Sequence, residues 1–136
     1  KRLGKPADQA DARSMLARLA RQPHFVHTAV ALCRQTPHHE AIALVTATVQ
    51  MKAYDEAAIE RYLASQEPMG KAGAYSIQGM GGELIEMIRG DFLGIVGLPL
   101  RVVATLLAGA GVSVPVDVDA LYRDKPYPNW SRFAND

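Results

Sequence analysis

The segment best suited to chemistry is residues 67–82, which holds five glycines around one lysine, Lys71. Glycine lets backbone N–H groups approach an anion closely, and a lysine adds positive charge beside them. The helix expected after this segment would also point its positive end at such an anion. The segment is not a Walker A loop, because "GKA" lacks the Ser or Thr. It therefore predicts an anion or ligand site, with a flexible surface connection as the alternative.

Three more side chains are candidates for the same site. Gln78 offers a donor and an acceptor, which suits the edge of a base, although a loop glutamine can also bond its own backbone. Lys5 precedes a helix start and could contact a phosphate, or it could simply be solvated. Glu67 opens the glycine-rich segment and could help hold a divalent ion.

Other chemistry is disfavoured by the residue pattern. His24 and His27 are three apart on an expected strand, so they point to opposite faces and cannot share a metal there. Cys33 is the single cysteine, which excludes an internal disulfide and fits a reducing cytoplasm. The serines lack the G-x-S-x-G context of a nucleophile elbow.

The first half of the chain predicts helices on either side of a strand pair. Helical spacing of apolar residues covers residues 6–22, with Asp8 as the N-cap. Alternating residues predict strands at 24–33 and 41–52, and the short link between them implies antiparallel pairing. A second helix is expected at residues 55–65.

The second half is expected to begin with a short helix at residues 82–90 that ends at Gly90. A buried strand or extended segment should follow at 91–98, and then a helix over 99–111 with Pro99 in its first turn. The fold class is therefore mixed α/β (α+β), with a partly antiparallel sheet and flanking helices. We expect a domain at 1–112 and an extended tail at 113–136, with one short turn near residues 119–123.

Length and charge narrow the function classes. A chain of 136 residues corresponds to about one domain. Fifteen basic and fourteen acidic side chains give a formal net charge of +1, so no global field attracts nucleic acid or a membrane surface. No apolar run approaches the roughly 20 residues needed to cross a bilayer.

Several motifs in order resemble the Maf family, the septum-formation-protein-like nucleotide pyrophosphatases. "LGKP" lies at residues 3–6, "GKAGAY" at 70–75 and "IQG" at 77–79, and "IVGLPL" follows at 95–100. The resemblance covers about residues 3–111. It implies a fold like the C-terminal part of the Maf/ITPase-like fold.

The resemblance implies hydrolysis of dTTP or UTP to the monophosphate and pyrophosphate, with Mg²⁺ or Mn²⁺ as cofactor. Lys5 matches the family's active-site lysine, and Gln78 matches a position tied to substrate choice. By the same resemblance, the remaining substrate-binding residues are Lys71, Gly70, Gly73, Gly79 and Glu67.

The sequence departs from the family pattern at one important place. The family's Ser/Arg phosphate loop and its catalytic Asp precede the LGKP segment, and neither is found in this sequence. We therefore expect the chain alone to be inactive. The alternative is a non-catalytic nucleotide-binding or protein-interaction module linked to cell division. Strand edges left without partners should favour a homodimer.

Overall fold

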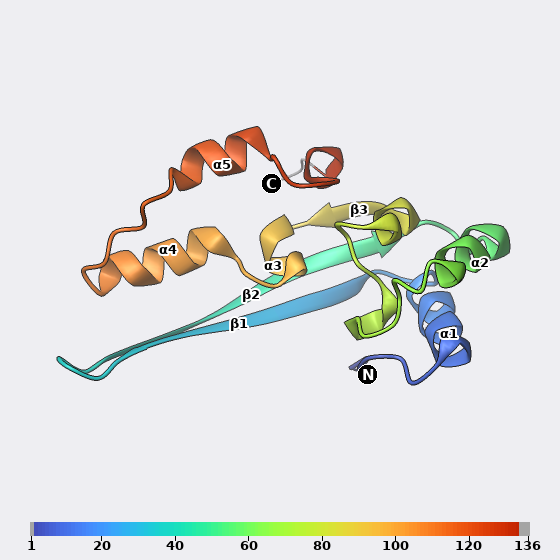
Figure 1. The fold of residues 1–136 in the computed structure, drawn as a ribbon, viewed down its shortest axis with the longest axis horizontal. Coiled ribbons are helices and arrows are strands. Elements are labelled where there is room, and N and C mark those ends of the chain that lie inside the picture. The colour runs from blue at the N-terminus through green and yellow to red at the C-terminus, as the bar shows by residue number, and fades with distance from the viewer. Residues whose placement is uncertain (1, 134–136) are drawn as a thin grey trace.

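A computed structural model describes residues 2–133 and has a three-stranded antiparallel sheet in the order β1-β2-β3 (Figure 1). β1 (His24–Arg34) and β2 (His39–Met51) form one long hairpin, in register from His24 opposite Val49 to Arg34 opposite His39. β3 (Ile85–Arg89) pairs only with the last four residues of β2. The expected mixed fold with an antiparallel strand pair is confirmed.

Two capped helices lie side by side at one end of the sheet (Figure 1). α1 (Gln9–Leu19) begins after Asp8, whose side chain accepts a hydrogen bond from the Asp11 N–H. α2 (Glu56–Ala64) begins after Asp55, which accepts from two N–H groups of its first turn. A short polar side chain at the N-cap satisfies amides that have no partner within the helix. Both predicted helices and the predicted Asp8 cap are confirmed.

The prediction of a helix at residues 82–90 is wrong. A 3₁₀ helix, Met80–Leu84, leads directly into β3. The reason is the free edge of β2, whose backbone groups need partners: the Lys52 N–H donates to the Leu84 carbonyl at the start of this pairing. Gly90 ends a strand rather than a helix, with φ +106°. The glycine-rich segment therefore leads into a 3₁₀ helix and a strand, and not into the α-helix that was expected to point its dipole at an anion.

The prediction of a buried strand or extended segment at residues 91–98 is also wrong, because these residues contain the helix α3 (Phe92–Val96). Asp91 accepts a hydrogen bond from the Leu93 N–H, and Gly97, at φ +136°, follows the last turn. Phe92 and Leu93 are buried against the core. Five residues are too few for helical and buried-strand patterns to differ, so the sequence alone misled.

Residues beyond α4 (Leu100–Gly109) form structure of their own. The α4 helix was predicted, but the segment after it is not an extended tail, because it contains α5 (Val118–Asp124) and the 3₁₀ helix Trp130–Phe133. Trp130 is 1% exposed and stacks on Phe92 with ring centroids 5.5 Å apart. Burying aromatic rings stabilises this segment, and the three prolines in it do not prevent that.

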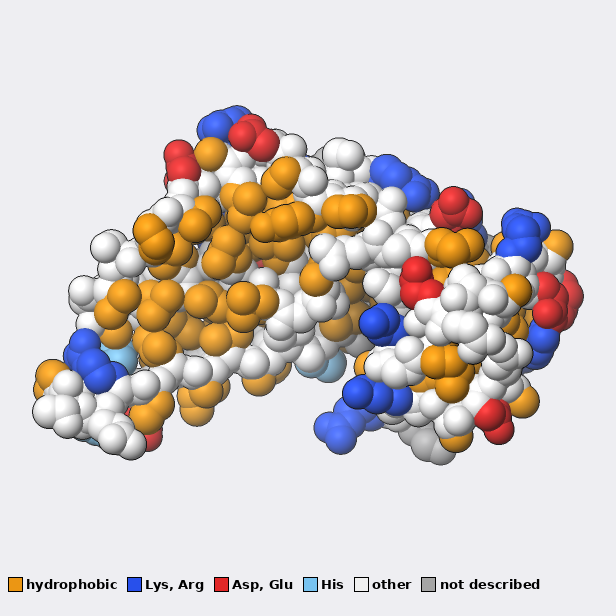
Figure 2. All heavy atoms as spheres, viewed as in Figure 1, with side chains coloured by type: hydrophobic (Ala, Val, Ile, Leu, Met, Phe, Trp, Pro, Cys, Tyr) orange, Lys and Arg blue, Asp and Glu red, His pale blue; other side chains and the backbone are white. Residues whose placement is uncertain are grey.

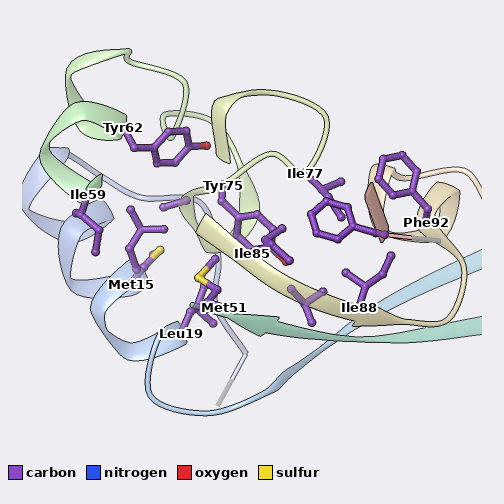
Figure 3. Close-up of a cluster of buried hydrophobic side chains, with 14 of the residues drawn as sticks. Met15, Leu19, Met51, Ile59, Tyr62, Tyr75, Ile77, Ile85, Ile88 and Phe92 are labelled. Carbon is purple, nitrogen blue, oxygen red and sulfur yellow. The ribbon is translucent and has the colours of Figure 1, made fainter. Parts of the chain in front are cut away.

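The core lies at the end of the sheet that carries β3 (Figure 3). It joins α1, α2, the last residues of β2, β3, α3 and the aromatic side chains of residues 122–133. The labelled side chains in Figure 3 converge from α1, α2, the loop, β2, β3 and α3. Tyr122, Trp130 and Phe133 belong to the same buried cluster, so the C-terminal segment, residues 111–133, shares this core. Across residues 2–133, none of the helices has the length and apolar character that a membrane span requires.

Candidate functional site

Glu67 organises the glycine-rich loop. Its Oε1 accepts hydrogen bonds from the Tyr62 hydroxyl, at 2.9 Å, and from the Gly81 N–H, at 3.1 Å. Its Oε2 accepts from the Met80 N–H at 3.0 Å. The Tyr62 hydroxyl also accepts from the Ser76 N–H at 3.1 Å, and Figure 3 shows that hydroxyl directed toward the loop. One carboxylate thus joins the two ends of the loop, and burial raises the pKa of Tyr62.

Gly79 is required by space rather than by backbone conformation. Its φ is −99°, which any residue adopts. A Cβ added there would lie 2.6 Å from Glu67 Oε1, inside van der Waals contact. The glycine therefore lets the backbone approach the carboxylate, and this contact fixes the chain immediately after Gln78.

Gly73 joins the loop to the N-terminal segment. It has φ +72° inside the 3₁₀ turn Ala72–Ala74, a conformation that favours glycine. Its N–H donates to the Gly4 carbonyl at 2.9 Å. Lys5 directly follows Gly4, so the segment carrying Lys5 lies beside the loop, and the Lys5 side chain is exposed. Gly70, at φ +77°, turns the chain just before Lys71.

Lys71 and Gln78 line the same cavity, whose volume is about 320 Å³. Its apolar wall comes from β1, from the loop and from α3. The lining residues are Val26, Lys71, Ala72, Tyr75, Ser76, Ile77, Gln78, Ile95 and Val96. This volume suits a small ligand or one part of a larger one.

Lys71 is the one Lys, Arg, Asp or Glu side chain among the residues that line the cavity. The Tyr75 hydroxyl and His24 Nε2 form a hydrogen bond of 2.9 Å, and the tautomer of His24 decides which of the two donates. Burial raises the pKa of the Tyr75 hydroxyl and lowers the pKa of His24, so both stay neutral. None of the lining residues carries a carboxylate. The cavity can therefore bind an anion through Lys71 and a hydrogen-bonding group through Gln78.

The residues described do not fit a divalent ion held by protein ligands. Among residues 2–133, no three His, Cys, Asp or Glu side chains come together in a metal-binding group. His24 and His27 lie on opposite faces of β1, as their alternating burial indicates. Both oxygens of Glu67 already accept hydrogen bonds from N–H groups of the loop, Oε1 from Gly81 and Oε2 from Met80.

The structure thus brings together two of the predicted site residues, Lys71 and Gln78. Lys5 lies in the segment bonded to the loop. Gly70, Gly73, Gly79 and Glu67 shape the loop and do not line the cavity. Sequence reasoning missed one further residue of this region, Asn129, which contacts the loop from 50 residues away in the chain.

A larger cavity, about 650 Å³, lies between α1, α2, the end of β2 and the Met80–Leu84 turn. Lys52, Arg61 and Arg132 line it together with Asp55 and Glu83. Its charges are of both signs, and it contains none of the predicted site residues. No pattern in the sequence indicated it, because its walls come from five separate segments.

Comparison with known proteins identifies relatives of this chain. The family model described as "Maf-like protein" matches residues 1–110. The dTTP/UTP pyrophosphatase of Bordetella parapertussis is 50% identical over 113 residues, which is 83% of this chain and 54% of that protein. The proteins of the same name from Shewanella oneidensis and Dictyoglomus thermophilum are 47% and 45% identical, over 81% and 82% of this chain and 56% and 58% of theirs. The chain spans little more than half the length of these curated relatives.

Proposed function

Because the chain belongs to the Maf family, we propose that it carries the nucleotide-binding part of a nucleoside triphosphate pyrophosphatase acting on dTTP and UTP. One observation carries this proposal: a lysine and a glutamine that are seven residues apart line one cavity of otherwise uncharged residues. A triphosphate needs positive charge, and a pyrimidine edge needs a donor and an acceptor.

Each proposed residue has a distinct role. Lys71 binds phosphate oxygens from within the cavity, and Gln78 hydrogen-bonds the edge of the base. Lys5, on the neighbouring segment, stabilises the charge that develops on phosphate oxygens when water attacks the phosphoanhydride. Gly70, Gly73, Gly79 and Glu67 hold the loop in the shape that this binding requires.

The chain by itself should bind nucleotide without hydrolysing it. Activating water requires a general base, and the cavity lining offers no carboxylate and no histidine for that task. Mg²⁺ or Mn²⁺, expected from the family, would be held by groups outside this cavity or arrive with the triphosphate. A cytoplasmic location stays a prediction.

Calorimetric titration with UTP and dTTP tests the proposal. We expect binding to the wild-type chain, a loss of about tenfold in affinity for Lys71→Gln, and no release of pyrophosphate with Mg²⁺ or Mn²⁺. Arg89→Gln is the control, because this exposed basic side chain lies on β3, outside the cavity lining. Absence of UTP binding would contradict the proposed function, and turnover by the isolated chain would contradict the predicted inactivity.

A second candidate function is that of an interaction module, and one observation favours it. The outer face of the hairpin exposes Phe25 by 64%, Ile42 by 79% and Leu44 by 68%. Large apolar side chains gathered on one sheet face mark an interaction surface. A homodimer formed through this face agrees with nucleotide binding and does not replace it.

A further inference from the structure

We infer that the C-terminal segment, residues 111–133, belongs to the nucleotide site because Asn129 positions the part of the loop that carries Gln78. The family model ends at residue 110, so Asn129 lies outside the matched region. The inference rests on the proposed function, since it concerns how that site recognises the base. Asn129 acts through Gln78 and is therefore a positioning residue.

Asn129 binds the backbone on both sides of Gln78. Its Nδ2 donates one hydrogen bond to the Ile77 carbonyl, at 2.8 Å, and another to the Gly79 carbonyl, at 2.9 Å. A primary amide has two hydrogens on its nitrogen, so one side chain satisfies both acceptors. The two carbonyls flank the residue whose side chain lines the cavity, and fixing them fixes where the Gln78 side chain begins.

The loop leaves space for this amide. A Cβ added at Gly82 would lie 2.5 Å from Asn129 Nδ2 and 2.8 Å from the Ile77 carbonyl oxygen. Glycine at this position therefore permits the approach of Asn129. Three glycines, at 79, 81 and 82, give this stretch a flexible backbone, so its shape depends on hydrogen bonds from outside it.

Asn129 is itself held by the residues next to it. Trp130 is almost fully buried, lies parallel to Phe92 and meets the edge of Tyr122 at 5.2 Å. The Tyr122 hydroxyl donates to Asp91 at 2.9 Å, and Asp91 caps α3. Since Ile95 of α3 lines the cavity, the segment and the cavity wall share one packed support.

Recognition of a base edge needs an amide placed with little freedom, because a hydrogen bond weakens steeply with misalignment. Binding of phosphates by a flexible lysine needs much less. Loss of the Asn129 amide should therefore impair recognition of the base and leave recognition of the phosphates intact. This difference separates a positioning role from a purely structural one.

The test compares Asn129→Gly and Asn129→Asp with the wild-type chain. Asn129 has φ +68°, which glycine adopts without strain, so the first variant removes the amide and spares the backbone. The second keeps the shape and replaces the donor by an acceptor. Lys125→Gly is the matched control, since it places a glycine at another left-handed position of the segment, φ +46°, and leaves the amide in place.

Two probes are titrated into each variant: UTP, and inorganic tripolyphosphate, which has no base. For both Asn129 variants we expect UTP affinity to fall about tenfold, as for loss of about one well-placed hydrogen bond, with tripolyphosphate affinity unchanged. Amide hydrogen exchange of residues 77–82 should become faster. In a Gln78→Ala background, Asn129→Gly should cause no further loss of UTP affinity, because the two residues act as a unit.

The outcomes separate this inference from the proposed function. If the wild-type chain binds no UTP, the proposed function fails, and the base-positioning role with it. If the wild type binds UTP and the Asn129 variants bind it equally well, only the inference is overturned. Equal losses for UTP and tripolyphosphate, or unchanged hydrogen exchange in residues 77–82, would also overturn it.

Discussion

Two regions of the molecule, the β1–β2 hairpin and the end of the sheet that carries β3, differ greatly in how far their side chains are buried. At the end that carries β3, side chains from α1, α2, the loop and the C-terminal segment surround one core. Along the hairpin, from His24 to Thr46, no residue is fully buried. Figure 2 shows apolar side chains gathered over α4 and α5, and a recess in the outline of the molecule beneath the hairpin. The hairpin is therefore held by its strand ladder, by partial cover from α3 and α4, and by hydrogen bonds from Thr28 and Arg34 to the carbonyls of Gly94 and Ala110. Full burial of side chains stabilises the other end.

This difference shows what alternation in a sequence can and cannot predict. Alternating residues specify a strand with two faces, and β1 and β2 formed as expected. They do not specify that both faces are covered. The outer face, carrying Phe25, Ile42 and Leu44, has no covering element among the described residues.

The largest effect on stability should come from Trp130→Ala. Removing a fully buried tryptophan leaves a cavity and should lower the free energy of unfolding by about 3–5 kcal/mol. The matched change in the other region, Ile42→Ala, should alter it by less than about 0.5 kcal/mol, because that side chain is 79% exposed. Urea unfolding monitored by far-UV circular dichroism, a backbone signal that does not require Trp130, measures both free energies. Similar losses for the two variants would abolish the contrast between the regions.

A smaller effect should appear with pH at the boundary between the regions. His24 begins β1, its Nδ1 is buried without a hydrogen-bond partner, and burial lowers its pKa below the usual value. The unfolded chain therefore binds a proton at His24 more readily than the folded chain does. The contribution of neutral His24 to the free energy of unfolding is complete above about pH 6.5, and it is lost as the pH falls toward the pKa of His24 in the folded chain.

The measurement is the pH dependence of urea unfolding between neutral and mildly acidic pH. His24→Gln, which cannot titrate, should flatten that dependence, and His27→Gln on the exposed face should not. An unchanged pH dependence in His24→Gln would contradict this account.

The smallest effect on stability should accompany the largest effect on association. Ile42→Lys with Leu44→Lys adds charge to the exposed face and should change the free energy of unfolding by no more than about 0.5 kcal/mol. Like charges brought together at an interface oppose pairing of two copies. Light scattering should show a dimer for the wild type and a monomer for the variant. A wild-type monomer would contradict the predicted homodimer.

The sequence predicted the elements whose signals are local. Asp8 and Asp55 marked the starts of α1 and α2, and alternation marked the hairpin. β3, α3 and the helices after residue 112 escaped prediction because they are short and take their conformation from distant partners. For the site, the resemblance pointed to Lys71 and Gln78. The roles of Glu67 and Asn129 depend on hydrogen bonds between residues that are far apart in the chain, and such bonds produce no periodic pattern of residues in the sequence.

The closeness of Gly79 to Glu67 constrains how this protein can change over time. A larger residue at position 79 collides with the carboxylate, and a shorter acid at position 67 releases the Tyr62 hydroxyl and two amides. A change at position 79 must displace the Glu67 carboxylate from its hydrogen bonds, so the two positions depend on one another. Libraries that vary this loop should therefore randomise the two positions jointly, so that each residue at position 79 is sampled beside side chains at position 67 that leave it room.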